Sequence, residues 1–380
     1  MNRPPADEAQ VLATADLMSA RLSAHGYDLL ILDQDWCVET DARGRRRRCF
    51  DPHGRPAPVE ARFPSSSGRR GLAPLAAALR ARGLRLGVHL DRGVPFDAVS
   101  ARATVHRSAI PIAAIARAGE PAKDGDGMLG VDVLQGGAQD YYDSIFAQLT
   151  AWGVDFVRTG GWDAADLADR LELEAMRRAA DASGGTITLH TAAGGAPLPG
   201  GDSRSRLGDE SDRLRRLCLS GGLSPWGEAN GLPQGLLDIG TSRADGSKDD
   251  IRSLVTLWAI AGAPLVFGGD LNGLDAADWA LLTNDEVVAV NQMATAARPL
   301  FERGVLSAWT SRAADGSARH LAIFNRSGDP RVATLPIYAW VEIGAGWARD
   351  LWSGCAGQLE VLLSRPIPPR SSMLLKIETR

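Results

Sequence analysis

Cysteine is scarce in this sequence, with four residues among 380, namely Cys37, Cys49, Cys218 and Cys355. Four widely spaced thiols exclude a disulfide framework, and their spacing matches no zinc pattern. The short interval between Cys37 and Cys49 leaves one bridge open. His, Asp and Glu also form no cluster with the spacing of metal ligands. We therefore expect a reducing, cytoplasmic setting and no metal or other cofactor.

Long apolar runs and a surplus of one charge are also missing. No apolar stretch reaches the roughly 18–20 residues that cross a bilayer, and the first residues, MNRPPADEAQ, lack the pattern of a secretory signal. The 42 Lys and Arg nearly balance the 46 Asp and Glu, giving a formal net charge of −4. These features argue against nucleic acid or a membrane as partner. We accordingly interpret the run Arg45–Arg48 as a solvated hairpin turn.

The sequence up to about Glu302 does contain an alternation of short apolar runs with helix-like segments rich in Ala, Leu and Arg. The apolar runs are Tyr27–Asp33, Leu84–Asp91, Val154–Thr159, Thr186–His190, Leu236–Gly240 and Pro264–Asp270. Such alternation is typical of βα units with a parallel sheet buried on both faces. With a weaker candidate near Ser205–Asp209, it predicts an α/β fold, a (β/α)₈ barrel, over residues 1–302.

The last part of the sequence has no helical periodicity. Its short strand-like runs are separated by Gly, Asp and Pro turns, and they are Val305–Thr310, His320–Asn325, Arg331–Leu335, Ala339–Ile343 and Ser371–Ile377. This texture predicts a small, sandwich-like antiparallel β domain over residues 303–380.

Four segments carry a family resemblance. They are FDPHGRPAPVEARFPS (Phe50–Ser65) with LRLGVHLDRGVP (Leu84–Pro95), GVDVLQGGAQDYYDSIFAQLTAWGVDFVRTGGW (Gly130–Trp162) and LVTLWAIAGAPLVFGGDL (Leu254–Leu271). In this order they resemble the bacterial branch of glycoside hydrolase family 27, the melibiase or α-galactosidase family. The resemblance implies a (β/α)₈ barrel followed by an antiparallel β domain.

The resemblance also bears on the first barrel strand. Tyr27–Asp33 corresponds to the family's second strand, and no counterpart of the first strand's Gly-Trp-Asn-Ser-Trp-like motif precedes Gln10. Either the first strand is missing or the sequence starts too late. A missing strand would expose an unpaired edge, which Met1–Asp7 or a partner chain would have to cover.

A glycine occupies the family's nucleophile position. A retaining glycosidase needs two carboxylates about 5–5.5 Å apart, and in the family the nucleophile is the Asp of a Lys-x-Asp motif closing the fourth strand. Here the motif reads Arg158-Thr159-Gly160. Because glycine has no side-chain oxygen, the ordinary double displacement cannot run through Gly160. Asp163 is the nearest substitute, but we interpret it as the N-cap of a helix over Ala164–Ala180.

The resemblance places the acid/base at the sixth strand. Aligned on the downstream Ser-Asp pair, the acid/base is Asp209; counted four residues on from Arg206, it is Glu210. We assign Asp209, with Glu210 as the alternative. A competing interpretation is that both are solvated acids at the start of a helix.

The resemblance also implies which residues contact the sugar. They lie at or near the ends of the predicted strands and are Asp33, Trp36, His89, Asp91, Arg158 and Arg206. Asp33 matches an acceptor for sugar hydroxyls. Trp36 is either an apolar wall for the sugar ring or a core side chain, and His89 is either ring-facing or structural. Arg158 keeps the positive charge of the family's lysine but adds a planar fork.

Two functions follow. The first is an α-galactosidase-like glycoside hydrolase that acts on an α-linked galactoside or a related sugar, with a mechanism altered or impaired at Gly160. In this mechanism water would replace the nucleophile, and Asp163 or Asp91 would serve as the base that activates the water. The alternative is a catalytically inactive family member that binds carbohydrate or has a structural or regulatory role. The expected partner is a small saccharide or glycoside, and the sequence leaves the oligomeric state open.

Overall fold

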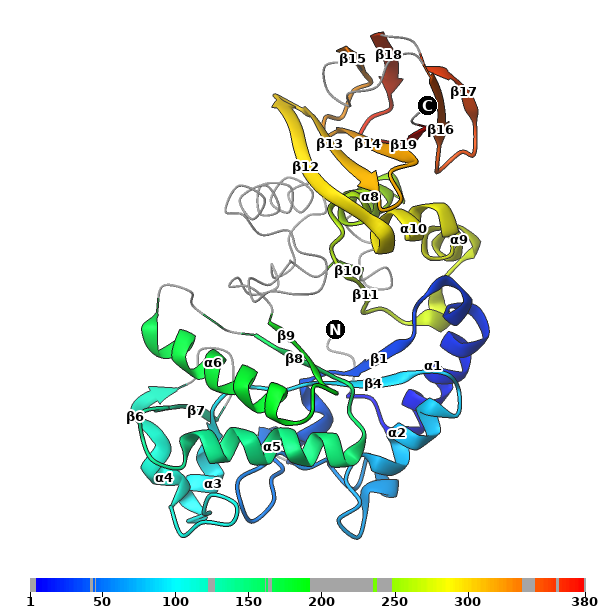
Figure 1. Cartoon of the computed structure of the whole chain (residues 1–380). Coiled ribbons are helices and arrows are strands. Elements are labelled where there is room, and N and C mark those ends of the chain that lie inside the picture. The colour runs from blue at the N-terminus through cyan, green and yellow to red at the C-terminus, as the bar shows by residue number, and fades with distance from the viewer. Residues whose placement is uncertain are drawn as a thin grey trace. The chain divides into compact units, whose positions relative to one another are not determined.

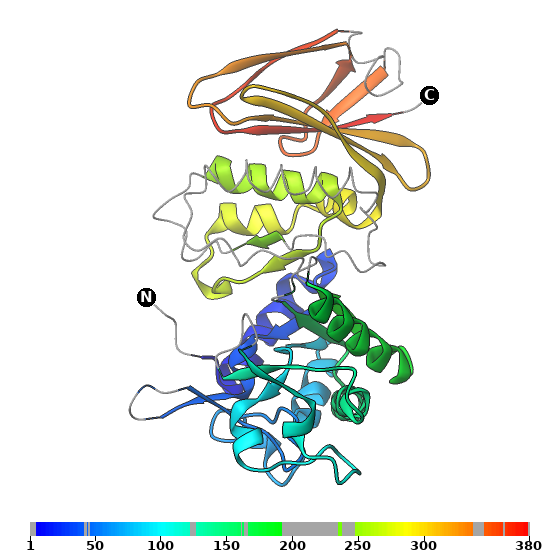
Figure 2. The ribbon, with the colours of Figure 1, turned by 90° about the vertical axis from the view of Figure 1, so that its left-hand side faces the viewer.

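The computed structural model describes residues 5–41, 44, 46–121, 127–160, 162, 166–191, 235–237, 248–336, 346–359 and 362–378 (Figures 1 and 2). The chain divides into two compact units, residues 1–196 and 197–380, and each is described by itself. The predicted domain boundary at residues 302 and 303 falls at the end of strand β12 (Ala294–Arg303). This boundary lies inside the second unit, and the division into two units does not test it. The limits of the two predicted domains stay a prediction.

The first unit contains a parallel sheet of four strands in the order β1-β4-β8-β9 (Figure 1). The strands are β1 (Leu29–Leu32), β4 (Arg85–His89), β8 (Phe156–Thr159) and β9 (Thr188–Thr191). Each coincides with a predicted apolar run, and their spatial order follows the chain, as in successive βα units. Among the described residues from Pro5 onward, no strand precedes β1.

Four helices pack on one face of this sheet: α1 (Glu8–Arg21), α2 (Ala73–Arg80), α5 (Ala138–Trp152) and α6 (Leu167–Ala182). Their buried side chains form a single apolar core with alternate residues of the strands, including Leu30, Leu32, Leu86, Val88 and Val157. Residues between these in the strands point to the opposite face of the sheet. The helices thus leave that other face available for a site.

The start of α6 corrects one prediction. Helix α6 begins at Leu167, and the side chain of Asp166 caps it by accepting hydrogen bonds from the backbone N–H groups of Ala168 and Asp169. The N-cap assigned to Asp163 is therefore wrong, because the acid directly before the first helical turn takes that place. Asp163 itself lies outside the described residues.

Short elements connect the strands and helices of the first unit. The antiparallel hairpin is β2 (Val38–Thr40) with β3 (Arg46–Arg48), and a small sheet joins β5 (Val94–Pro95), β7 (Met128–Val131) and β6 (Ala116–Pro121). The short helices are η1 (Ser23–His25), η2 (Gln34–Cys37), η3 (Pro64–Ser66), α3 (Phe96–Ser100) and α4 (Ile112–Ile115).

The disulfide left open by the sequence is not formed. The backbone N–H of Cys49 donates to the carbonyl of Cys37 over 2.7 Å, yet both thiols are free. Cys37 is buried in the core, and burial raises its pKa to about 12. A thiol in this environment is an inert apolar side chain rather than a nucleophile.

Before strand β12, the described residues of the second unit form a parallel strand pair and three α-helices. They are β10 (Gly235–Leu237), β11 (Leu265–Phe267), α8 (Lys248–Ala261), α9 (Ala276–Leu282) and α10 (Asp285–Met293), with a short η5 (Leu271–Gly273). Asp270 caps η5, where its side chain accepts a hydrogen bond from the backbone N–H of Asn272. None of the helices that the structure describes is both long and apolar enough to span a bilayer.

The chain ends in antiparallel sheets, as predicted. Six strands pair in the order β12-β13-β14-β19-β16-β17, and two more form the pair β15–β18. Besides β12 they are β13 (Leu306–Ala313), β14 (Ala318–Asn325), β15 (Arg331–Pro336), β16 (Gly346–Asp350), β17 (Ala356–Leu359), β18 (Leu362–Ile367) and β19 (Ser372–Glu378). The predicted run Ala339–Ile343 lies outside the described residues.

Candidate functional site

Four polar residues stand side by side where the four parallel strands of the first unit end. The strand register pairs His89 with Arg158, and Arg158 with His190. The β1–β4 register places Asp33 next to His89, with 3.8 Å between its Oδ1 and the imidazole Nδ1. Because paired residues of parallel strands point to the same face, we call Asp33, His89, Arg158 and His190 the strand-end row. It lies at the carboxyl ends of the strands, where barrel enzymes bind substrate.

Burial sets the protonation of the row. Burial lowers the pKa of His89, while the charge of Asp91 acts in the opposite direction. Burial and then Arg158 lower the pKa of His190 to about 4. Burial also lowers the pKa of Arg158 from its ordinary value, opposed by the charge of Asp33, but a guanidinium stays protonated in proteins. Near pH 7 the row therefore holds two neutral histidines and one cation.

Two nitrogens of the row are buried without a partner. Within the described part of the chain, Nδ1 of His89 and Nε of Arg158 form no hydrogen bond. Buried polar groups are nearly always hydrogen-bonded in folded proteins. Two such nitrogens on neighbouring strands are what we expect where the polar atoms of a ligand complete the bonding.

A buried ion pair holds Asp91, the residue whose carboxylate faces Nε2 of His89. Arg48 forms an ion pair with Asp91, and their side chains are only 9% and 7% exposed. The other carboxylate oxygen of Asp91 lies 3.6 Å from Nε2 of His89. The interpretation of Arg45–Arg48 as solvated is therefore wrong for Arg48. The β2–β3 hairpin delivers this arginine to the site, which sequence spacing alone does not reveal.

Trp36 supports the row from within the core. The indole is 2% exposed, donates from Nε1 to the carbonyl oxygen of His89 over 2.8 Å, and meets Trp152 edge-on at 6.4 Å between ring centroids. Of the two interpretations given above, this position is that of a core side chain. Its hydrogen bond fixes the backbone at the end of β4, which carries His89.

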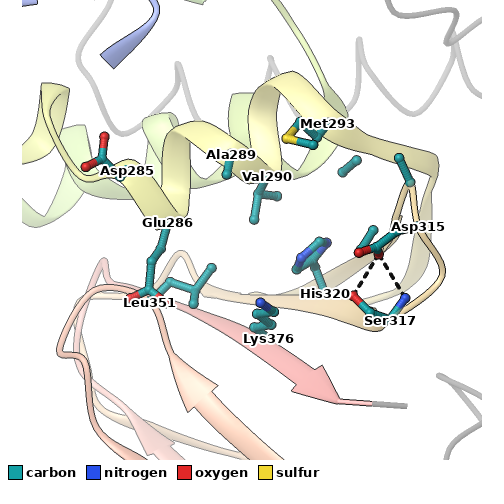
Figure 3. A pocket seen from close by; sticks show the side chains of 13 residues that line it. Asp285, Glu286, Ala289, Val290, Met293, Asp315, Ser317, His320, Leu351 and Lys376 are labelled. Carbon is teal, nitrogen blue, oxygen red and sulfur yellow. Dashed lines mark hydrogen bonds between the residues drawn. The ribbon is translucent and has the colours of Figure 1, made fainter. Parts of the chain in front are cut away.

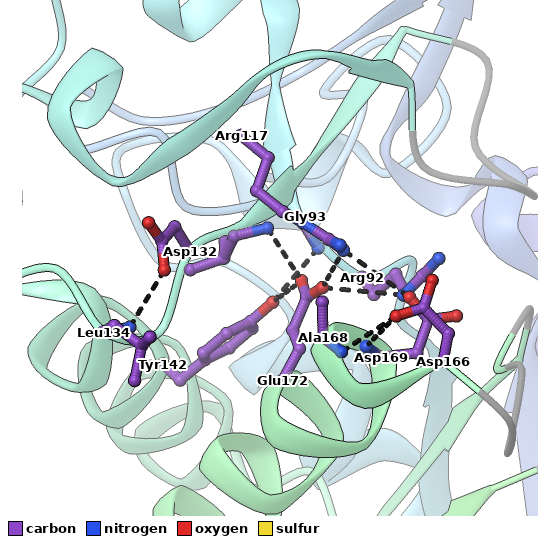
Figure 4. A network of polar contacts seen from close by, with 11 residues as sticks. Arg92, Gly93, Arg117, Asp132, Leu134, Tyr142, Asp166, Ala168, Asp169 and Glu172 are labelled. Carbon is purple, nitrogen blue, oxygen red and sulfur yellow. Dashed lines mark hydrogen bonds and ion pairs between the residues drawn. The ribbon is translucent and has the colours of Figure 1, made fainter.

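A second cluster of charges joins the loop after β4 to helix α6 (Figure 4). Arg92, 4% exposed, forms ion pairs with Asp169 and with Glu172, the second at 3.5 Å. Arg117 donates to Glu172 over 3.1 Å, and the hydroxyl of Tyr142 donates to the same carboxylate over 2.5 Å. Burial raises the pKa of Glu172, and the hydrogen bond from Tyr142 acts against this increase.

The same arginine reaches the segment after β8. The guanidinium of Arg92 lies over the ring of Trp162, 4.9 Å from its centroid. Trp162 follows Gly160 by two residues and is 6% exposed. A desolvated cation–π contact of this kind stabilises by about 2 kcal/mol. The loop after β4 and the segment around the family's nucleophile position are thereby tied together.

The predicted site residues are only partly brought together. Asp33, His89 and Arg158 form the row, with Asp91 behind it. His190 belongs to the row as well, although it was not among the predicted site residues: the register of β8 with β9 places it beside Arg158. The remaining predicted residues, Asp163, Arg206, Asp209 and Glu210, lie outside the described residues, so their roles stay predictions.

A cavity in the second unit contains none of the predicted residues. It measures about 310 Å³ and opens between α10 and the strands β13, β14 and β19 (Figure 3). His320 and Lys376 line it, and burial, followed by the charge of Lys376, lowers the pKa of His320 to about 4. In the described part of the chain, this cavity included, no group of three His, Cys, Asp or Glu side chains could hold a metal ion.

Comparisons with known sequences find similarity to α-galactosidases. The family model described as alpha galactosidase A matches residues 233–293. Alpha-galactosidase 2 of Arabidopsis thaliana is 25% identical over 368 residues, which cover 91% of this chain and 78% of the plant protein. Alpha-galactosidase A of Cellvibrio japonicus is 22% identical over 98% of this chain and 88% of its own length.

Solved structures give the same result for the fold. The β-L-arabinopyranosidase of Geobacillus stearothermophilus, a GH27 enzyme solved with arabinose, superposes with a TM-score of 0.87 at 29% identity, covering 99% of this chain and 94% of that one. A Bacillus halodurans protein described as an α-N-acetylgalactosaminidase gives 0.88 at 26% identity, with 99% and 94% covered. The predicted fold, a (β/α)₈ barrel followed by an antiparallel β domain, is confirmed.

Proposed function

Since this chain belongs to glycoside hydrolase family 27, we propose that it acts on an α-linked galactoside or a related pyranoside by a mechanism altered at Gly160. The observation that carries the proposal is the strand-end row, in which Asp33, His89 and Arg158 stand together at the carboxyl ends of three adjacent strands. Acceptor, imidazole and cation side by side can hold the hydroxyl groups of one sugar ring.

The chemistry must do without a covalent intermediate at Gly160. A water molecule in the space of the missing carboxylate would attack the anomeric carbon, with Asp209 protonating the leaving oxygen. Such an inverting reaction needs a base to activate the water. The ion pair with Arg48 argues against Asp91 as that base. Asp163 stays a candidate, and Asp33, whose side chain is 82% exposed, joins it.

A second candidate function is carbohydrate binding without turnover. The observation that favours it is the combination of Gly160 with a row whose other nearby acid, Asp91, is already engaged by an arginine. In that case the same strand-end row binds a sugar but leaves its glycosidic bond intact. The partner is a small saccharide in both proposals, and we place the protein in the cytoplasm on the strength of its sparse cysteines.

Turnover of aryl glycosides separates the two functions. Nitrophenyl α-galactoside and nitrophenyl β-L-arabinopyranoside are incubated with the wild-type protein and with Asp209→Ala. We expect slow hydrolysis by the wild type with inversion at the anomeric carbon, observed by proton NMR, and its loss in Asp209→Ala. Binding of galactose by calorimetry without any turnover would support the second candidate. Equal turnover by the variant would overturn the assignment of Asp209.

A further inference from the structure

The row contains a cation, Arg158, that forms no ion pair with any residue the structure describes. The buried arginines around it are all paired: Arg48 with Asp91, and Arg92 with Asp169. No described residue forms an ion pair with Arg158, and its Nε is buried without a hydrogen bond. Arg158 is only partly buried, but a polar nitrogen taken out of water without a hydrogen bond is costly, and such groups normally acquire a partner.

The described part of the chain supplies no good partner for Arg158 nearby. Asp33 attracts Arg158 electrostatically, but it stands on β1, separated from β8 by β4, and its side chain faces solvent. Gly160, two residues beyond Arg158, has no side chain. The missing negative charge is therefore best supplied by the ligand.

The neighbours of Arg158 indicate what kind of anion fits. A guanidinium offers two parallel N–H groups that match the two oxygens of a carboxylate. His89 and His190 flank it in register, and the neutral imidazole of His89, whose Nδ1 is buried without a partner, offers one donor and one acceptor. One cation suits a singly charged carboxylate. A phosphate dianion would meet too little positive charge here, and would be repelled by Asp33.

We propose that the strand-end row binds a sugar acid, with the carboxylate of the sugar paired to Arg158 and its hydroxyls bound by His89 and Asp33. This inference rests on the proposed function, whose pocket it uses, and specifies the substrate class as a glycoside of a uronic acid rather than of a neutral sugar. Arg158 is then the residue that determines specificity.

Calorimetry with a matched set of ligands tests the inference. D-galacturonate and D-galactose differ only in the group at carbon six, and methyl galacturonate keeps the shape of the acid without its charge. We expect galacturonate to bind wild-type protein about 10- to 100-fold more tightly than galactose, the range for a charge-assisted pair. The methyl ester should bind as weakly as galactose.

Variants locate the effect. Arg158→Gln should remove the preference for galacturonate, and Arg158→Lys, which keeps the charge without the fork, should retain only part of it. Arg85→Gln is the matched control, because it removes the same charge at the opposite end of the neighbouring strand, from an exposed ion pair with Asp28. It should keep the full preference. If Arg158→Gln fails to fold, the methyl ester comparison still decides the question in the wild type.

The outcomes distinguish the two proposals. If galactose binds as tightly as galacturonate, the inference that the ligand is a sugar acid is overturned, while the proposed function stays intact. Acetate binding as tightly as galacturonate would also overturn it, since the sugar ring would then contribute nothing. Absence of binding by all these sugars, together with no hydrolysis of aryl glycosides, would overturn the proposed function itself.

Discussion

Arg48 and Asp91 form an ion pair in which both side chains are more than nine-tenths buried, and the free oxygen of Asp91 faces His89 at 3.6 Å. The hairpin that follows β1 is thereby coupled to the end of β4. Breaking a buried pair by removing one partner leaves an uncompensated charge. The pair is thus a structural element of the site as well as part of its electrostatics.

Arg48→Met is expected to lower the free energy of unfolding by about 3–5 kcal/mol, because Asp91 would be left buried and unpaired. Urea unfolding followed by circular dichroism measures the change. Arg46→Met is the matched control on the same strand: its pair with Asp35 is partly exposed, so its loss should cost less than about 1 kcal/mol. Equal effects of the two variants would contradict the role given to Arg48.

Glu172→Gln should destabilise the first unit by about 2–4 kcal/mol, because Arg92 and Arg117 would lose a shared, fully buried counterion. Glu174→Gln on the same helix is the control, since its side chain is 54% exposed in a weak pair with Arg177. The midpoints of thermal unfolding of the two variants provide the comparison. A midpoint for Glu172→Gln within about 1 °C of the control would show that the network carries little stability.

Stability should fall as the pH drops from about 6.5 to about 4. Burial lowers the pKa of His190 and of His320 to about 4 in the folded protein, so in this window the unfolded chain binds more protons than the folded one. Each histidine therefore contributes stability above about pH 6.5 that is lost on acidification, on the order of 2–3 kcal/mol. Urea unfolding at pH 7 and pH 4.5 measures the loss.

Histidine variants assign that pH dependence. In His190→Gln and in His320→Gln, the difference in unfolding free energy between the two pH values should shrink. An unchanged pH dependence in both buried-site variants would rule out these histidines as its source.

A small anion should replace the missing nucleophile. Formate or azide fits the space left by a carboxymethyl group at Gly160 and is expected to raise the hydrolysis rate of an activated aryl α-galactoside. Gly160→Asp should raise it without any added anion, because it restores the carboxylate at that position. The measurement is release of nitrophenol with and without anion. If neither anion nor Gly160→Asp has any effect, the site has lost more than its nucleophile.

The apolar runs were sufficient to predict the parallel strands, because a strand buried on both faces needs apolar residues almost throughout. Tyr27–Asp33 and Leu84–Asp91 contain β1 and β4 in full. Strand β12 escaped prediction because it is polar, contains Pro299 and lies at the edge of its sheet, where proline is tolerated.

The site was harder to predict than the fold. Asp33, His89 and Arg158 could be named because the family resemblance carries sugar contacts over to these positions, but their alignment depends on a register between strands far apart in the sequence. That register adds His190. The role of Arg48 was hidden for a related reason: four consecutive arginines look like a solvated turn, and only the β2–β3 pairing shows which of them turns inward.

The central claim is that a saccharide pocket persists at the strand ends although the attacking carboxylate is absent. A crystal structure of the protein soaked with galactose or galacturonate tests it most directly. We predict a sugar ring bound against Asp33, His89 and Arg158, with its anomeric carbon facing Gly160. A strand-end row filled by the chain's own side chains, with the sugar bound elsewhere or not at all, would contradict the claim.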